Sequence, residues 1–343
     1  MKSIVYRETG APSVLTLIDR ELPEPGENEV RIRIAVSGVN PTDWKSRQGS
    51  KPGQPLDFPE VVPNQDGAGL VDAVGSGVSG LAVGERVWTV IAAYQRAYGG
   101  TAQEFAIVDA DRVYPLPDAA SFELGASLGV PAVTAHRALT VSEDGPSRLA
   151  PGALDGKTVL GAGGAGAVGH AAIQLARWAG ATVITTVSRP EKAALAKSAG
   201  AQHVVNYRET DAAKEIRQIA PDGVDLVVEV APGQNAALNQ AVLRNHGTVA
   251  VYANNGGDTM TLDVRAHFAI NVRYQFLLLY TVGQKARDDA AEDISAAIEA
   301  GALPIGTDAG LPLHFFDLAE TADAHAAVES DQVGKVLIRV AAL

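Results

Sequence analysis

The chain has 343 residues, of which 46% are hydrophobic and 20% charged, and its formal net charge is -12. This length predicts two domains rather than one core. The acidic balance argues against nucleic acid and anionic membranes as partners, because phosphate groups attract basic surfaces. The chain has no cysteine, which excludes disulfides, thiolate zinc sites and cysteine nucleophiles. We therefore expect a small molecule as the partner.

The N-terminal half is rich in short strand-like runs. Residues 1–6 already alternate as a strand does, and they lack the charged and apolar regions of a secretory signal, which favours a cytoplasmic protein. Further strand-like runs, separated by turns, follow at 30–36, 68–74 and 86–90, up to about Leu116. This half predicts a compact β-barrel.

From about Ser121 the pattern changes to Ala-rich helical segments that alternate with apolar strands, which is typical of a parallel sheet with crossover helices. Six strands are enough for a complete doubly wound sheet, and we expect them at residues 158–160, 182–187, 203–205, 226–230, 248–252 and 274–280. The apolar run within the last of these is far shorter than the ~20 residues that cross a bilayer. We interpret it as a buried strand.

The C-terminal part predicts two amphipathic helices and a closing strand. The helices are expected around residues 288–300 and 317–329, and the strand at 335–340. We expect this strand to return to the first domain.

A glycine-rich turn joins the strand at 158–160 to a helix. Its frame Gly164-x-Gly166-x-x-Gly169 matches the dinucleotide fingerprint, in which glycines permit a tight turn, the approach of a pyrophosphate and close contact between helix and strand. A chance match in a glycine-rich chain is the alternative. The fingerprint predicts cofactor contacts at Gly164, Ala165, Gly166, Ala167, Val168 and Gly169.

The next strand predicts which dinucleotide is bound. It ends at Ser188, Arg189 and Lys192, about 20 residues past the glycines, where an NAD enzyme would place an acid on the ribose 2′-hydroxyl. A hydroxyl and two cations suit a 2′-phosphate instead, so NADPH is favoured. The alternative is that both cations are solvated residues in the first turn of the following helix.

The sequence resembles the medium-chain dehydrogenase/reductase family over essentially its whole length, and most of all its zinc-free quinone oxidoreductase, or zeta-crystallin-like, branch. The resemblance rests on the glycine turn and on residues 37–43, 65–69 and 129–135. It implies an α/β protein with a GroES-like β-barrel catalytic domain, residues 1–125 and 290–343, and an NADPH-binding Rossmann domain, residues 126–289.

The family's zinc alcohol dehydrogenases hold their catalytic metal at positions that resemble Asn40, Gln65 and Val130 here. Asn and Gln are poor zinc ligands and Val is none, so we expect no metal. The seven histidines are scattered singly, without the spacing of a metal site. Isolated carboxylates such as Asp43, Asp57 and Asp66 are usually surface or capping groups. The proton donor stays unassigned.

The resemblance also implies roles for single residues. Asn40 and Thr134 would be the catalytic residues at the nicotinamide, with Lys45 nearby, although Asn40 can also be a plain turn residue before Pro41. Tyr207 would pack by the 2′-phosphate, or be an ordinary strand-end aromatic. The carboxyl ends of later strands should line the ribose and nicotinamide, with contacts at Ala231, Val251, Tyr252, Ala253 and Asn254.

The apolar stretch Phe276-Leu277-Leu278-Leu279 resembles the family's last Rossmann strand, which touches the nicotinamide side and pairs across a two-fold axis. We therefore expect cofactor contacts at Leu277, Leu278 and Leu279, and a homodimer, since so apolar an edge would otherwise aggregate. The chain departs from the family pattern at Trp44 and at residues 142–147, which we expect to reshape the mouth of the cleft.

Three functions fit the sequence. The first is NADPH-dependent, zinc-independent transfer of hydride to a quinone. The second is reduction of an enone, a 2-alkenal or an enoyl thioester, including a biosynthetic tailoring step. The third, of another class, is a non-catalytic NADPH-binding protein, because a fold does not guarantee a function.

Overall fold

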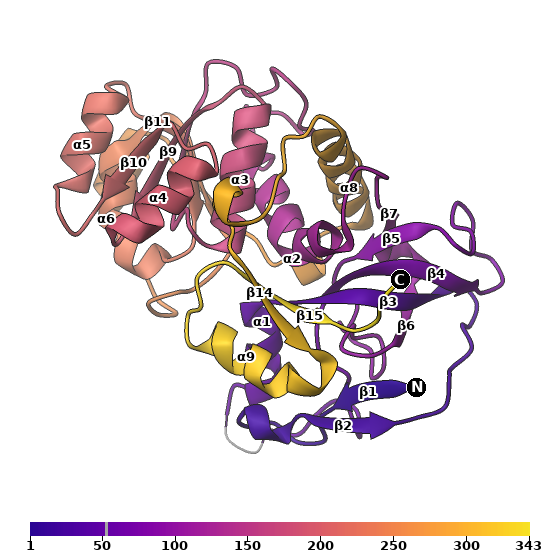
Figure 1. Cartoon of the computed structure of the whole chain (residues 1–343). Helices are drawn as coiled ribbons and strands as arrows, with labels where there is room; N and C mark the ends of the chain where they lie inside the picture. The colour runs from indigo at the N-terminus through magenta and orange to yellow at the C-terminus, as the bar shows by residue number, and fades with distance from the viewer. Residues whose placement is uncertain (52–53) are drawn as a thin grey trace. The chain divides into compact units, whose positions relative to one another are not determined.

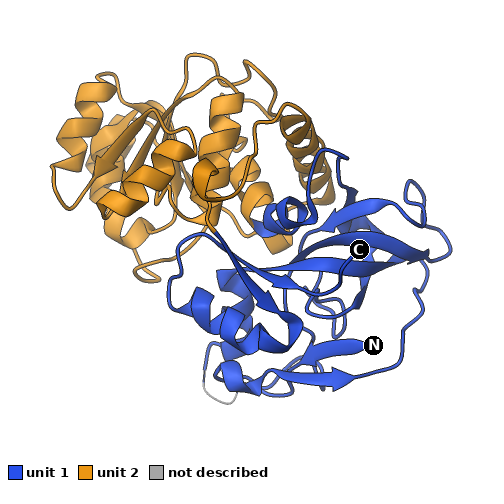
Figure 2. Cartoon of the chain, in the orientation of Figure 1, with its two compact units in different colours: residues 1–130, 313–343 blue, residues 131–312 orange. Residues whose placement is uncertain are grey.

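The computed structural model describes residues 1–51 and 54–343. The chain forms two compact units (Figure 2): unit 1 is Met1–Val130 with Leu313–Leu343, and unit 2 is Pro131–Pro312. The second boundary differs from the expected one at residue 290. It lies later because helix α8, Gln284–Glu299, is bonded to other residues of unit 2 through Asp293.

Unit 1 contains a seven-stranded sheet and a separate two-stranded one. The strands are β1 Lys2–Val5, β2 Thr16–Asp19, β3 Glu29–Val39, β4 Asp66–Val74, β5 Arg86–Thr89, β6 Phe105–Asp109, β7 Val113–Pro115, β14 Leu313–Asp317 and β15 Lys335–Arg339. The helices are η1 Pro12–Val14, α1 Pro41–Gln48, η2 Ala110–Arg112, η5 Leu318–Glu320 and α9 Thr321–Glu329, with the first part of α2 Phe122–Leu139.

Strand β3 organises unit 1 (Figure 1). One of its edges pairs with β4, while the other pairs first with β6 and then with β15. The strand predicted at 335–340 therefore does return to the first domain. The predicted β-rich domain is confirmed, and the pairs among the described strands form a path whose two ends are not joined. Alternating apolar residues of β3, with Val30, Ile32 and Ile34 fully buried, form its core.

Unit 2 contains the parallel sheet that the sequence predicts. Its strand order is β10-β9-β8-β11-β12-β13, which is the doubly wound order with the first strand of the unit near the centre. The strands are β8 Thr158–Ala162, β9 Thr182–Val187, β10 His203–Asn206, β11 Val224–Glu229, β12 Leu243–Val251 and β13 Arg273–Phe276. Buried aliphatic side chains such as Leu160, Ile184 and Val227 form the core.

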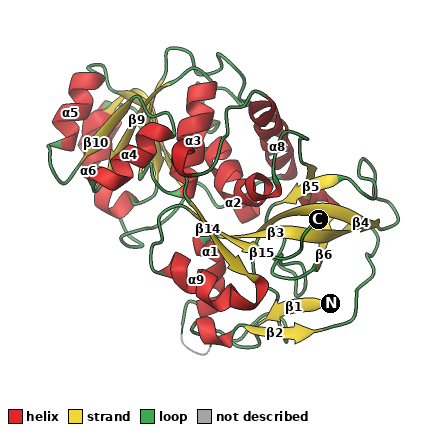
Figure 3. Cartoon of the chain, viewed as in Figure 1, coloured by secondary structure: helices red, strands yellow, loops and turns green. Residues whose placement is uncertain are grey.

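Helices connect successive strands of this sheet (Figure 3). The connecting helices are α3 Ala167–Trp178, α4 Pro190–Ser198, α5 Ala212–Ile219, α6 Pro232–Val242 and α7 Val264–Ala269; η3 Leu279–Thr281, α8 and η4 Thr307–Ala309 follow the last strand. Among the helices of the described residues, none has both the length and the apolar character that a membrane span requires.

The prediction of a buried strand over 274–280 is wrong in two respects. Strand β13 ends at Phe276, and a 3-10 helix follows at Leu279–Thr281. Phe276 and Leu278 are 59% and 58% exposed. Strand β13 lies at the end of the strand order, so no further strand packs beside it on its outer side.

Candidate functional site

In the glycine turn of unit 2, close packing requires glycine at two positions but not at a third. A Cβ on Gly164 would lie 2.2 Å from Thr185 Oγ1, and a Cβ on Gly169 would lie 2.5 Å from the Gly163 carbonyl oxygen. Gly166, in contrast, is exposed, has a φ of -82°, and a Cβ there would meet nothing closer than 3.6 Å. Packing does not explain this glycine, whereas a ligand that approaches the backbone would.

The same turn leaves a helix N-terminus available. Gly166 is the N-cap of α3, and no side chain caps the first turn. The backbone N–H groups at such an end, together with the helix dipole, attract phosphate. The tightest point of the turn is Gly163, with a φ of 73°, which lies just before the frame that the sequence motif identifies.

Residues at the ends of β9 and β10 form a second anion-binding candidate. Arg189 is the N-cap of α4 and makes no side-chain cap, while Lys192 lies one turn later. Tyr207 N–H donates to the Val187 carbonyl oxygen at 3.1 Å, which places Tyr207 beside Ser188. The Tyr207 and Arg189 side chains are exposed. The structure thus brings Ser188, Arg189 and Tyr207 together at the carboxyl edge of the sheet.

The ends of β11 and β12 are organised by a carboxylate that the sequence analysis missed. Glu229 is fully buried and accepts hydrogen bonds from the Ala231 N–H at 2.6 Å, Asn235 Nδ2 at 2.9 Å and Asn239 Nδ2 at 2.6 Å. Burial, and then the charge of Glu229, raise the pKa of Tyr252 above its ordinary value, so its hydroxyl stays protonated. In the sequence, the available signal for Glu229 was an acidic residue at the end of an apolar strand.

The remaining predicted residues of unit 2, except Thr134, also lie at or after strand ends. Leu277 N–H donates to the Val251 carbonyl oxygen at 2.7 Å, which joins the ends of β12 and β13. Asn254 bonds to Asp258, and Leu279 is buried. Thr134 is buried within α2.

In unit 1, Asn40 lies in a buried polar cluster. Its side-chain Nδ2 donates to Asp66 Oδ2 at 2.6 Å, and its Oδ1 accepts from Lys335 Nζ at 2.7 Å. Its backbone N–H donates to Asp43 Oδ2 at 2.7 Å. Asn40 is therefore more than a turn residue before Pro41. Lys45, on the same helix, is exposed, with its Nζ 5.9 Å from the centre of the Trp44 ring.

The sequence suggested surface or capping roles for Asp43 and Asp66; neither lies at the surface, but Asp43 does cap α1 by accepting the Asn40 N–H. Asp43 is 3% exposed and Asp66 is fully buried, whereas Asp57 is exposed. Asp43 accepts from the Gln65 N–H at 3.0 Å, and Asp66 from the Val130 N–H at 2.8 Å. Burial, and then the charge of Asp66, raise the pKa of Asp43 to about 8. The three positions that resemble zinc ligands are thus connected by two carboxylates.

A cavity of about 460 Å³ lies beside this cluster within unit 1. Its lining is mixed polar and aromatic, and includes Tyr6, Asp43, Phe58, Gln65, Tyr94 and Arg96. Burial, and then the charge of Asp43, raise the pKa of Tyr6 to about 12, so its hydroxyl remains a hydrogen-bond donor. Arg96 is paired with Glu29 and Asp109, so its charge is already compensated. This cavity can accept a flat, polar organic molecule.

Residues 142–147 lie beside the start of β13. Within unit 2, Glu143 and Asp144 form ion pairs with Arg273, which begins β13. This is the amino end of the strand, opposite to the edge that carries the glycine turn. Within unit 2 this segment therefore lies away from the glycine turn, and its effect on the mouth of the cleft stays a prediction.

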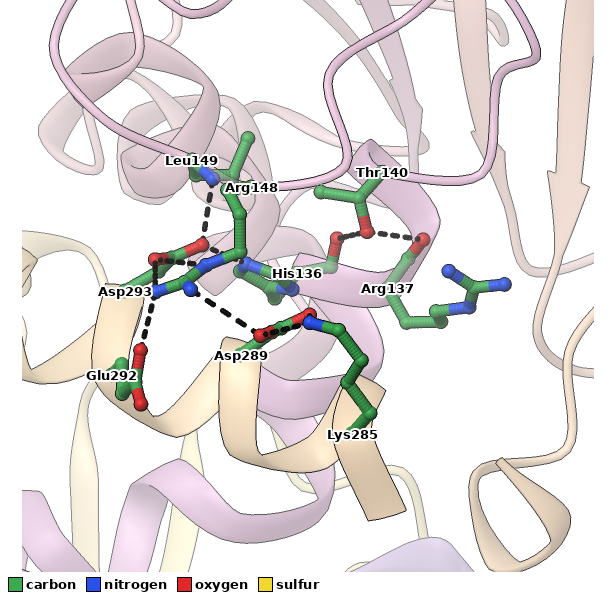
Figure 4. Close-up of polar contacts among 9 residues, drawn as sticks. All are labelled: His136, Arg137, Thr140, Arg148, Leu149, Lys285, Asp289, Glu292 and Asp293. Atoms are coloured by element: carbon green, nitrogen blue, oxygen red, sulfur yellow. Dashed lines mark hydrogen bonds and ion pairs between the residues drawn. The ribbon is translucent and has the colours of Figure 1, made fainter. Parts of the chain in front are cut away.

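A buried histidine–carboxylate pair joins α2 to α8 (Figure 4). His136 Nε2 lies 2.7 Å from Asp293 Oδ2, which also accepts the Leu149 N–H, while Asp293 Oδ1 accepts from Arg148. His136 stands alone in the sequence because this partner is 157 residues away. Within residues 1–51 and 54–343, no group of three or more His, Cys, Asp or Glu residues is arranged to hold a metal ion.

Comparison with known proteins gives consistent matches. Residues 26–118 match the alcohol dehydrogenase GroES-like domain, and residues 167–302 the family model described as zinc-binding dehydrogenase. The quinone oxidoreductase of Rattus norvegicus is 31% identical, over 98% of this chain and 97% of the relative.

Solved structures agree. The quinone oxidoreductase of Escherichia coli complexed with NADPH is 25% identical, with a TM-score of 0.81, over 99% of this chain and all of the other. A 2-haloacrylate reductase is 26% identical, with a TM-score of 0.81, over the whole of both chains.

Proposed function

Because the chain is an oxidoreductase that belongs to the quinone oxidoreductase branch of the medium-chain dehydrogenase/reductase superfamily, we propose that it transfers hydride from NADPH to a quinone without zinc. NADPH, when bound, supplies the two electrons and one hydrogen as hydride. The protein holds the dinucleotide in unit 2 and the acceptor in unit 1.

The residues at the start of α4 are the main support for NADPH as the cofactor. Ser188, Arg189 and Lys192 surround an uncapped helix N-terminus, and Tyr207 lies beside them. A 2′-phosphate there would gain charge-assisted hydrogen bonds and the helix dipole. The exposed Gly166 at the uncapped start of α3 supports a pyrophosphate next to it. The Escherichia coli neighbour was solved with NADPH.

The acceptor is assigned to the cavity of about 460 Å³, which has the size and mixed lining expected for a quinone. Tyr6 would donate a hydrogen bond to an acceptor carbonyl, and Asn40 and Thr134 are proposed to act at the nicotinamide. We propose that no zinc takes part, because Asn40 and the carboxylate of Asp66 are already bonded to each other and to Lys335.

The second candidate is reduction of an activated alkene. A 2-haloacrylate reductase shares the fold over the whole chain, and its name describes such a reaction. An enone or an enoyl thioester would use the same cofactor site. A non-catalytic NADPH-binding role is the third candidate, and any steady turnover would exclude it.

We also propose a homodimer that forms through β13, and a cytoplasmic location. The exposed Phe276 and Leu278 on an edge strand support the dimer. Cell fractionation with immunodetection tests the location.

The first experiment follows the absorbance of NADPH and NADH with 1,4-benzoquinone, 9,10-phenanthrenequinone or 2-alkenals, before and after EDTA. We expect rapid NADPH oxidation by a quinone, insensitive to EDTA. Arg189→Ala and Lys192→Ala should each raise the KM for NADPH by about 10- to 100-fold, because each removes a charge-assisted bond, and should leave the KM for NADH unchanged. Lys197→Ala, at the other end of α4, is the matched control.

Loss of activity with EDTA, or equal effects of Arg189→Ala on NADPH and NADH, would contradict the proposal. Preference for alkenals would favour the second candidate. Tight NADPH binding without turnover of any acceptor would favour the third.

A further inference from the structure

Among the described residues, Lys335 is the one buried lysine, with 1% of its surface exposed. It opens β15, whose register pairs Val336 with Val39 of β3. Lys335 is therefore next to Asn40, although 295 residues separate the two along the chain. Its Nζ lies 2.7 Å from Asn40 Oδ1 and 3.8 Å from Asp66 Oδ2.

These contacts define the orientation of the Asn40 amide. An ammonium only donates, so the atom that it faces must be the amide oxygen; a carboxylate only accepts, so the atom that it faces must be the amide nitrogen. A flipped amide would place its NH2 group against the ammonium and its oxygen against the carboxylate. Both contacts would then be repulsive.

The backbone around the cluster is shaped to allow these contacts. A Cβ on Gly129 would lie 2.1 Å from Asp66 Oδ1, and a Cβ on Gly38 would lie 2.1 Å from the Ala126 carbonyl oxygen and 3.2 Å from Lys335 Cε. The absence of a Cβ at both glycines thus leaves space for the buried ion pair. The pair is compensated within itself, which makes it tolerable in the interior.

We propose that Lys335 and Asp66 are positioning residues: they fix the orientation of the side-chain amide of Asn40, the residue proposed to act at the nicotinamide. The role of Asn40 rests on the proposed function, whereas its fixed orientation does not. The ion pair stands where the sequence resembles a zinc site, and it orders Asn40 with an ammonium in place of a metal.

The test combines kinetics and NMR on the full-length protein. Asp66→Asn/Lys335→Met removes the two opposite charges of the pair together, so that neither is left buried without the other. We expect kcat with a quinone to fall by about 10- to 100-fold, because a misoriented group near the reacting atoms costs this much, while the KM for NADPH stays within about two-fold. Lys197→Met, an exposed substitution, should change neither.

A double-mutant cycle separates positioning from structural support. If Lys335 and Asp66 act through Asn40, then adding Asp66→Asn/Lys335→Met to Asn40→Ala should cause no further loss of kcat. Multiplied losses in the combined variant, or an unchanged kcat in Asp66→Asn/Lys335→Met, would overturn the proposal.

NMR keeps the test independent of activity. The side-chain NH2 signals of Asn40, identified by their loss in Asn40→Ala, should exchange slowly in the native protein and rapidly in Asp66→Asn/Lys335→Met. Equal exchange in both proteins would overturn the inference. If the native protein reduces no acceptor but its Asn40 signals behave as expected, the proposed function fails while the fixed orientation stands.

Discussion

Buried ionisable side chains hold distant segments of each unit together. In unit 2, Asp293 accepts hydrogen bonds from His136, Arg148 and the Leu149 N–H. Burial alone would raise the pKa of Asp293, but the bonds from His136 and Arg148 outweigh it and lower this pKa to about 2. The carboxylate therefore stabilises the folded state only while it is ionised.

This pKa predicts how stability changes in acid. A carboxyl group with a lowered folded-state pKa stabilises fully above its unfolded pKa of 3.8 and loses the contribution as pH falls from about 4 to about 2. The contribution is roughly 2 kcal/mol. Asp293→Asn should therefore lower the free energy of unfolding at pH 6, and by only about half as much at pH 3, measured by urea titration. A cost that does not shrink at pH 3 would contradict the pKa.

Sequence reasoning located the glycine turn and predicted its role, but it did not find these carboxylates. The turn is local: its glycines, strand and helix lie within about twenty residues, so spacing reveals them. Asp66 and Lys335, like His136 and Asp293, meet only after the chain has folded. The one local signal, for Asp66 and Lys335, was a charged residue at the start of an apolar strand.

At the scale of elements, the exposed edge strand β13 predicts that two copies of the chain associate. Phe276→Asp and Leu278→Asp should convert a dimer to monomers, because each places a charge in an apolar contact between copies. Light scattering coupled to size exclusion measures this. Val83→Asp, at an apolar position of unit 1 that is 65% exposed, is the matched control and should leave the mass unchanged. A monomeric native protein would contradict the proposed dimer.

The strand pattern predicted the sheet of unit 2 well, but it failed at β13. Period and β-propensity identify apolar runs, yet they do not distinguish a central strand from an edge strand. Leu277 to Tyr280 continue the apolar run, while the backbone turns into a 3-10 helix at Leu279–Thr281. Position in the sheet, a long-range property, decides which faces are covered.

At the scale of the whole molecule, unit 1 is assembled from two separate parts of the chain, whereas unit 2 is continuous. A chain that stops after Pro312 lacks β14, β15 and α9, and leaves Asp66 without Lys335. We expect unit 1 to unfold and unit 2 to remain folded. Limited trypsin digestion with mass spectrometry should then yield a resistant fragment within residues 131–312. Protection of residues 1–130 would contradict this expectation.

The domain order was predictable because the closing strand at 335–340 is a clear apolar alternation and the family resemblance implies its return. The boundary near residue 290 was not, since an amphipathic helix does not reveal which unit covers its apolar face. The bonds of Asp293 to His136 and Arg148 assign α8 to unit 2.

The pairing of β3 with β15 also sets the order in which the protein matures on the ribosome. Residues 1–130 emerge first, but the edge of β3 at Val36–Val39 stays open until residues 335–339 have been translated. At ~5–20 residues per second, this delay lasts roughly 10 to 40 seconds. Unit 2 is complete before then. The nascent chain therefore finishes its second unit first, and the earliest part to be synthesised is the last to acquire its native structure.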